Sequence, residues 1–158
     1  MRYNWTVATK VGSKAIKPNP KLKPLEVLIG EWDTDGSHPY FPGKALHGRT
    51  VFEWIEGGAF LLLRSEIDNP KFPDGIEIFG SDDAAGTFYM LHFDERGVSR
   101  KYDVAIEGNQ IKWWRDEPSF RQRYILKIED DKLVGLGEMS RNGSAWEPDL
   151  SLTYIRAS

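Results

Sequence analysis

The chain contains no cysteine, and its longest uninterrupted apolar run is only the five residues from Ala59 to Leu63. The first absence excludes disulfides, thiolate metal sites and a cysteine nucleophile. The second excludes a membrane-spanning helix, so we expect no membrane insertion. The net charge is −3 with both signs dispersed, which gives no electrostatic footprint for a nucleic-acid partner. The N-terminal residues lack the pattern of a secretory signal, and we therefore expect a cytoplasmic protein.

What the sequence does contain is typical of one folded domain. It has 158 residues, of which 40% are hydrophobic and 13% aromatic, and six of them are tryptophan. Residues 1–19 are polar and basic, and we predict an N-terminal arm that is either flexible or anchored on a partner subunit through Tyr3 and Trp5. Residues 20–158 are predicted to form a single domain. At its start, Asn19 precedes a proline and leucines recur at 22, 25 and 28, which indicates a short helix that plugs one end of the domain.

From Gly30 onward the hydrophobic pattern has a period of two, and turn signals interrupt it every eight to twelve residues. Almost every connection is short enough for a hairpin, so strands should pair with their sequence neighbours. Closing such a meander removes its two exposed edges. The prediction is an all-β fold, a roughly ten-stranded antiparallel up-and-down barrel. The predicted strands are 29–38, 45–56, 59–68, 75–81, 86–94, 98–107, 110–116, 119–129, 132–140 and 145–156.

Gly30 and Trp32 lie two residues apart on the first strand and therefore share a face. Arg156 lies on the last strand and would cover the indole of Trp32 if the two strands meet. A glycine, a tryptophan and a basic residue in these places resemble the pattern of the lipocalin-like, or calycin, barrels. We interpret Gly30, Trp32 and Arg156 as structural closure of one barrel end. The chemistry is then expected at the opposite mouth.

Alternation of polar and apolar residues identifies the side chains that face the barrel interior. The strands at 59–68 and 86–94 carry apolar residues on both faces, and their inner faces stay unassigned. The inner polar residues cluster at the ends of three strands that meet at one mouth, which is expected to be open. The predicted ligand-binding residues are Arg100, Tyr102, Arg115, Gln122, Tyr124, Trp54, Trp113 and Phe52.

Two inner arginines beside tyrosines and a glutamine suit an anionic group, and the aromatic residues suit an apolar body. The sequence therefore predicts a barrel that binds a small hydrophobic or amphipathic ligand. The competing interpretation is that Arg100 and Arg115 form ion pairs at the rim with Glu66, Asp116 or Glu117. The loops at 37–44 and 68–75 are either a lid over the mouth or simply packed against it.

Two stretches resemble a narrower group of uncharacterised bacterial proteins, the DUF1579-type calycin-like domains. They are Leu28 to Trp32 followed by Gly48 to Leu61, and His92 to Val98. The resemblance covers about residues 25–156 and implies a calycin fold but no established activity, which leaves an enzyme uncertain and catalytic residues unassigned.

Two alternatives stay open. The nitrobindin-like haem barrels share the glycine–tryptophan motif, but Thr34 replaces one of their glycines and the last strand has no histidine, so we expect neither haem nor another cofactor. His38, His47 and His92 have no metal-site spacing, and no metal is expected. The other alternative is a filled barrel that acts as a protein-interaction module. An outward Trp113 or Trp114 would then be a contact in a homodimer.

Overall fold

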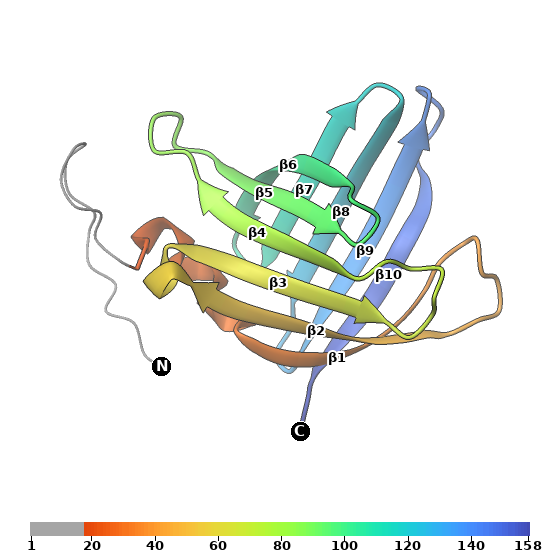
Figure 1. Ribbon diagram of the computed structural model, residues 1–158, viewed down its shortest axis with the longest axis horizontal. Coiled ribbons are helices and arrows are strands. Elements are labelled where there is room, and N and C mark those ends of the chain that lie inside the picture. The colour runs from red at the N-terminus through yellow and green to blue at the C-terminus, as the bar shows by residue number, and fades with distance from the viewer. Residues whose placement is uncertain (1–17) are drawn as a thin grey trace.

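A computed structural model describes residues 18–158, which fold into a closed barrel of ten antiparallel strands (Figure 1). Each strand pairs with its neighbours in sequence, and β1 pairs with β10, so the sheet has no free edge. The predicted fold class is confirmed. The arm predicted at the N-terminus lies almost wholly outside the described residues. The strands are β1 (Gly30–Ser37), β2 (Leu46–Ile55), β3 (Phe60–Ile67), β4 (Gly75–Ser81), β5 (Phe88–Asp94), β6 (Ser99–Glu107), β7 (Gln110–Glu117), β8 (Phe120–Ile128), β9 (Lys132–Arg141) and β10 (Glu147–Arg156).

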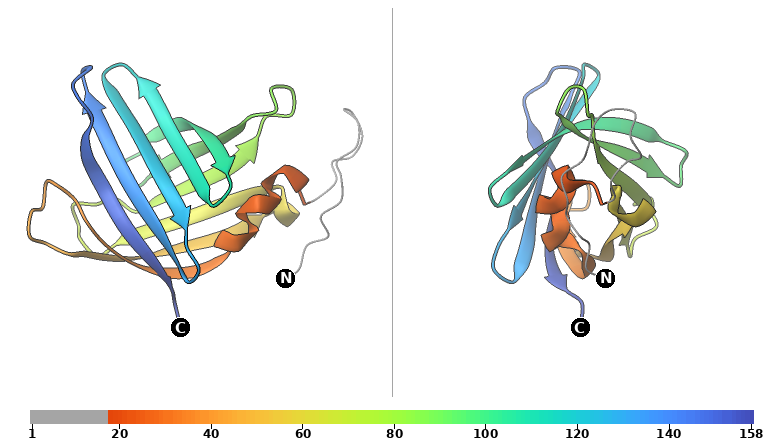
Figure 2. Two further views of the ribbon diagram at one scale, coloured as in Figure 1. Left: turned by 180° about the vertical axis from the view of Figure 1, so that it is seen from behind. Right: turned by 90° about the vertical axis from the view of Figure 1, so that its left-hand side faces the viewer.

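A 3-10 helix, η1 (Pro20–Leu28), lies across one end of the barrel (Figure 2). The Asn19 side chain caps it by accepting a hydrogen bond from the Lys21 N–H at 3.1 Å. Leu22, Leu25 and Leu28 are fully buried at the three-residue spacing that a 3-10 helix places on one face. The short helix η2 (Glu56–Gly58) joins β2 to β3 at the same end. No helix within residues 18–158 is long and apolar enough to span a membrane.

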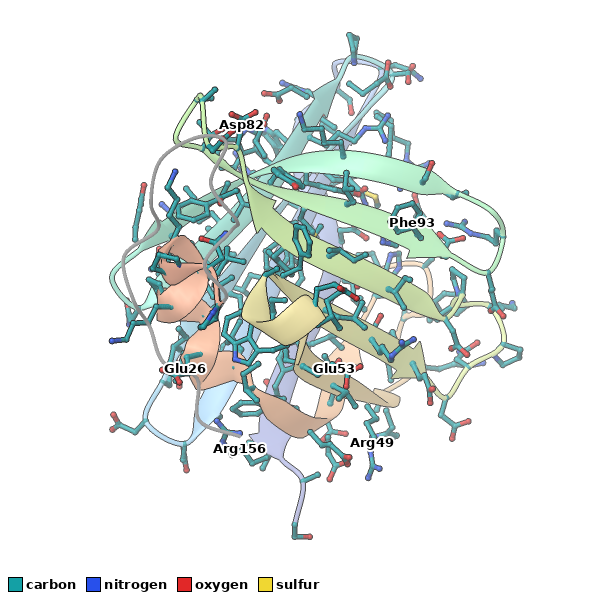
Figure 3. All side chains as sticks on the ribbon, turned by 60° about the vertical axis from the view of Figure 1, so that its left-hand side comes forward. Glu26, Arg49, Glu53, Asp82, Phe93 and Arg156 are labelled. Atoms are coloured by element: carbon teal, nitrogen blue, oxygen red, sulfur yellow. The ribbon has the colours of Figure 1, made fainter. Side chains whose placement is uncertain are left out.

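The first and last strands close the barrel beside this plug, where Trp32 and Arg156 are partners in the β1–β10 register. The Arg156 guanidinium lies 4.2 Å from the centroid of the Trp32 ring, a cation–π distance. It also donates hydrogen bonds to the carbonyls of Ile29 (2.9 Å) and Val27 (2.8 Å), and Figure 3 shows it at the plug end. Gly30 has φ +132°, and a Cβ there would lie 2.7 Å from Arg156 Nη1. The positive φ favours glycine at this position, and its missing side chain leaves room for the guanidinium.

The structure also assigns the two strands whose inner faces the sequence left open. On β3 the inward set includes Leu61 and Leu63, which are buried in the core cluster, whereas Arg64 is exposed. On β5, Met90 and His92 face inward, and Phe93 points to solvent. The connections β1–β2 and β3–β4 lie at the end opposite η1 (Figure 1). The plug and the mouth are thus at opposite ends of the barrel.

Candidate functional site

A cavity of about 510 Å³ occupies the barrel interior between the mouth and the core above the plug. This volume is within the range of pockets that hold one small molecule. Apolar and aromatic side chains make up much of its wall, and polar groups are concentrated toward the mouth. The apolar part of the wall includes Leu63, Met90, Trp113, Phe120, Leu152 and Tyr124.

The deep wall of the cavity is a packed aromatic cluster. Trp113 stacks on Tyr124 with ring centroids 4.7 Å apart and planes 18° apart, and Phe79 meets the edge of Trp113 at 5.8 Å. The Tyr124 and Tyr154 hydroxyls are 3.0 Å apart and share a hydrogen bond. Burial raises the pKa of Tyr154 to about 12 and raises the pKa of Tyr124 well above its usual value. Both phenols therefore stay neutral at physiological pH.

Toward the mouth, a chain of hydrogen bonds crosses the interior from β6 to the β1–β2 loop. Gln122 Oε1 accepts from Arg100 Nη1 at 3.2 Å and from the Tyr102 hydroxyl at 2.7 Å. Gln122 Nε2 donates to Asp149 Oδ2 at 3.0 Å, and Asp149 Oδ1 lies 2.9 Å from His38 Nε2. These partners fix the orientation of the Gln122 amide, because a flip would turn its NH₂ group toward the guanidinium.

The backbone N–H of Tyr40 donates to His38 Nδ1 at 3.1 Å. His38 Nδ1 is therefore unprotonated, and the proton on Nε2 points at Asp149. The Asp149 carboxylate accepts from both His38 and Gln122, so its charge is already satisfied within the network. It is not directly paired with the guanidinium of Arg100.

Among residues 18–158, the side chains that contact the Arg100 guanidinium are neutral. One of its five N–H groups serves Gln122, and its Cζ atom lies 5.5 Å from the centroid of the Phe120 ring. Within residues 18–158 no carboxylate forms an ion pair with Arg100. The hydrogen bond from Ser119 lowers the pKa of Glu117, and the nearby charge of Arg115 adds to this effect. Among the described residues Arg100 therefore forms none of the rim ion pairs considered from the sequence, whereas Arg115 interacts electrostatically with Glu117.

A second polar chain runs along β4 and β5, next to the first, because His92 on β5 pairs with Arg100 on β6. His92 Nδ1 lies 2.7 Å from Glu77 Oε1, and His92 Nε2 lies 3.1 Å from Asp94 Oδ2. Arg96 holds Asp94 through two side-chain bonds, Nε to Oδ1 at 3.1 Å and Nη2 to Oδ2 at 2.8 Å. The groups alternate in charge when His92 is protonated, which suits burial because each charge has an opposite neighbour.

The pKa values in this chain shift in directions that follow from these contacts. Burial raises the pKa of Glu77, and the hydrogen bond with His92 only partly offsets it. The Glu77 hydrogen bond raises the pKa of His92, with Asp94 adding to the effect. Arg96 lowers the pKa of Asp94. Asp94 therefore stays ionised. The raised pKa values of Glu77 and His92 both favour the protonated form of these two side chains.

One oxygen atom in the hydrogen-bonded chain from Glu77 to Arg96 has no hydrogen-bond partner. Glu77 Oε2 is buried and accepts no hydrogen bond, and it is the single buried side-chain nitrogen or oxygen in this state among residues 18–158. Glu77 lines the cavity, and its side chain retains 14% exposure. An unpaired buried acceptor is rare because it forfeits the hydrogen bonds that water would give it.

Two loops meet over the mouth. His38 and Phe41 lie in the β1–β2 connection, and Phe72 lies in the β3–β4 connection. The Phe41 and Phe72 rings are 5.2 Å apart, and the His38 ring is 5.6 Å from Phe72. All three side chains also line the cavity. These loops pack on one another and narrow the entrance.

The structure brings five of the eight predicted ligand-binding residues to the cavity wall: Arg100, Tyr102, Trp113, Gln122 and Tyr124. Phe52 is instead buried in the core at 1% exposure, and Trp54 packs half-buried against that core. Arg115 pairs with Gln122 in the β7–β8 register, but it is not among the cavity-lining residues.

Sequence reasoning missed Glu77 and Asp149. Glu77 shares a strand face with Phe79, which is fully buried, and that spacing of two is the signal that could have found it. Asp149 lies where the β9–β10 register shifts between Pro148 and Ser151. An irregularity of this kind re-aims a side chain, so strict alternation assigns Asp149 to the wrong face.

The histidines of the cavity do not fit a haem or metal site. His38 and His92 each have both ring nitrogens engaged in hydrogen bonds, and His47 contacts Asp35 on the exposed outer surface. A coordinating imidazole needs one nitrogen free for the metal. Among residues 18–158 no group of three or more potential ligand side chains is placed to hold a metal ion.

Comparison with known proteins supports the fold. No protein-family model and no curated protein matches the chain. The crystal structure of Rv2717c from M. tuberculosis aligns with a TM-score of 0.63 at 14% sequence identity, over 89% of this chain and 99% of that chain. At this identity the likeness concerns architecture, and the chain shares its barrel fold with that protein.

Proposed function

We propose that the protein is a small-molecule-binding barrel for an apolar or aromatic ligand that carries an anionic or polar group. One observation carries the proposal. The cavity of about 510 Å³ is largely apolar, and its wall contains Arg100, which has no carboxylate partner among residues 18–158. A guanidinium in such surroundings gains most from a ligand anion, because few water molecules compete for it.

Each lining residue has a distinct part in this proposal. Arg100 contacts the anionic group, while Tyr102 and Gln122 hold the guanidinium in place through the shared Oε1 acceptor. Trp113 and Tyr124 offer stacked aromatic faces to the apolar body. Aromatic faces of this kind bind flat ligands by offset or edge contacts.

The assignment of the chain to the DUF1579-type calycin-like domains is part of the same proposal. The DUF1579-type resemblance and the barrel fold together support a calycin-like binding protein, although the sequence motifs that carry the resemblance are mostly structural. A cytoplasmic location and a homodimer stay predictions of the sequence.

Isothermal titration calorimetry with 2-naphthoate tests the proposal. We expect saturable 1:1 binding, and we expect R100M to weaken it roughly tenfold or more, the size of one hydrogen bond to a charged group. R64M is the matched control, because Arg64 is exposed on the outer surface, where it pairs with Glu53, and does not line the cavity. Affinity for 2-naphthoate that is equal in wild type and R100M would contradict the assignment of Arg100, and no binding to wild type would contradict the proposed function.

A further inference from the structure

The cavity wall formed by β8 and β9 contains a tyrosine that lies flat on the sheet. Tyr124 on β8 lines the cavity, and Gly135 and Gly137 on the neighbouring β9 are both buried. A Cβ built on Gly135 would lie 2.7 Å from Tyr124 Cε1, and one built on Gly137 would lie 3.2 Å from Tyr124 Cδ2. These two atoms belong to opposite edges of the ring, so the face of the ring rests on the β9 backbone.

Gly135 provides space for this ring rather than a special backbone conformation. Its φ is not in the left-handed region, so the backbone itself would accept another residue. The three atoms nearest to a Cβ at Gly135 all belong to Tyr124, and they include the hydroxyl oxygen and Cζ. The hydroxyl is held at this place by its hydrogen bond with Tyr154 on β10, at 3.0 Å. An alanine would overlap the phenol, and the ring would have to leave the sheet.

A ring displaced from β9 moves toward the cavity, because the sheet lies beneath it. Trp113 stacks on Tyr124 with ring centroids 4.7 Å apart and planes 18° apart, so the indole covers the face that is turned away from β9. Both side chains line the cavity. A displaced Tyr124 would therefore push the indole into the space that a ligand would fill. Gly135 thus sets how far this aromatic stack extends into the barrel.

The stack lies within reach of a ligand whose anionic group binds Arg100. Gln122, which accepts from Arg100 Nη1 at 3.2 Å, and Tyr124 both line the cavity and are two residues apart on β8. Two residues of a strand span about 6.8 Å. When a carboxylate lies beside Arg100, the first ring of an aromatic acid stays short of the stack and a second fused ring reaches it.

We infer that Gly135 determines the size of ligand that the barrel accepts, because it lets Tyr124 lie flat and so keeps room for an aromatic acid with two fused rings. This inference rests on the proposed function and narrows its ligand class to flat acids that extend beyond one ring. Replacing Gly135 with alanine should restrict the cavity to one-ring acids, since the displaced stack would meet the second ring.

The test compares benzoate with 2-naphthoate by calorimetry. Wild type should bind 2-naphthoate roughly fivefold or more tightly than benzoate, because the second ring buries further apolar surface. In G135A this preference should vanish or invert, while the affinity for benzoate stays within about twofold of wild type. G75A is the matched control, because the nearest atom to a Cβ at Gly75 is 3.4 Å away and Gly75 does not line the cavity.

Two further variants decide the question even if G135A does not fold. Y124L removes the ring that a Cβ at Gly135 would meet, so Y124L and G135A/Y124L should bind 2-naphthoate with equal affinity. An affinity of G135A/Y124L about tenfold below that of Y124L would overturn the inference. Equal affinities of wild type for the two acids, or a preference for 2-naphthoate that persists in G135A, would also overturn it and leave the proposed function standing. Absence of binding of both acids to wild type would overturn both.

Discussion

At the scale of single residues, two chains of hydrogen bonds line the interior, and they differ in how their charged groups are arranged. The chain from Glu77 to Arg96 alternates acidic and basic groups along β4 and β5. The chain from Arg100 to His38 separates its cation from its anion by the neutral amide of Gln122. A direct ion pair with Asp149 would occupy the N–H donors of Arg100. The Gln122 amide between them instead orients the guanidinium and accepts from only one of its N–H groups.

The His92 imidazole should titrate above its ordinary pKa of 6.5, because it donates hydrogen bonds to two carboxylates. A raised pKa means that the folded protein binds this proton more tightly than the unfolded chain. The resulting stabilisation is full below about pH 6.5 and is lost as the pH rises through the folded-state pKa. Heteronuclear NMR of the imidazole Cε1–H signal across pH measures the midpoint.

In the same experiment, E77Q should lower the midpoint of His92, since the Glu77 hydrogen bond is the largest cause of the increase. The control E53Q changes the same charge on the outer surface and should leave the midpoint in place. A wild-type midpoint at or below 6.5, or one that E77Q does not move, would show that the Glu77–His92 contact is not formed in solution.

At the scale of elements, η1 acts as part of the core rather than as a surface helix. Its three leucines fill the end of the barrel that Trp32 and Arg156 close. The Trp32 Nε1–H donates to the Leu28 carbonyl at 2.8 Å, which ties the last turn of the plug to β1. Trp32 and Arg156 thus donate to backbone carbonyls that the end of the plug would leave without partners.

L25A should lower the free energy of unfolding by about 2–5 kcal/mol, because Leu25 is fully buried and its truncation leaves a cavity. Urea denaturation followed by tryptophan fluorescence measures the change. V27A in the same helix is the matched control, since Val27 is 44% exposed and should change stability by about 0.5 kcal/mol or less. Equal effects of the two substitutions would mean that η1 does not plug the barrel.

The sequence predicts elements well wherever alternation is strict. On β6 and β8 the polar and apolar positions separate cleanly, so Arg100, Tyr102, Gln122 and Tyr124 were assigned to the inner face that the structure shows. Alternation fails where a charged residue faces inward, as at Glu77, or where the strand is irregular, as at Asp149. Buried charges and register shifts depend on partners from other strands, which one sequence does not reveal. The sequence therefore predicts the cavity-lining residues of β6 and β8 and does not predict Glu77 or Asp149.

At the scale of the whole molecule, the barrel has a closed end and an open end. The ten-stranded closure removes exposed edges, and the plug allows the lower interior to be a packed core. Polar groups that would be costly in that core gather at the mouth, where the β1–β2 and β3–β4 loops meet. The fold therefore confines the cavity to the half of the barrel opposite η1.

The most direct test of a ligand site inside the barrel is the methionine methyl NMR spectrum of protein titrated with 2-naphthoate. Met90 lines the cavity, whereas Met139 is buried outside its wall, so the chain carries its own internal control. Binding inside the barrel should shift the Met90 signal saturably through ring currents and move Met139 much less, with M90L identifying the signal. A Met90 signal that stays in place at saturating 2-naphthoate would contradict a ligand site in the barrel.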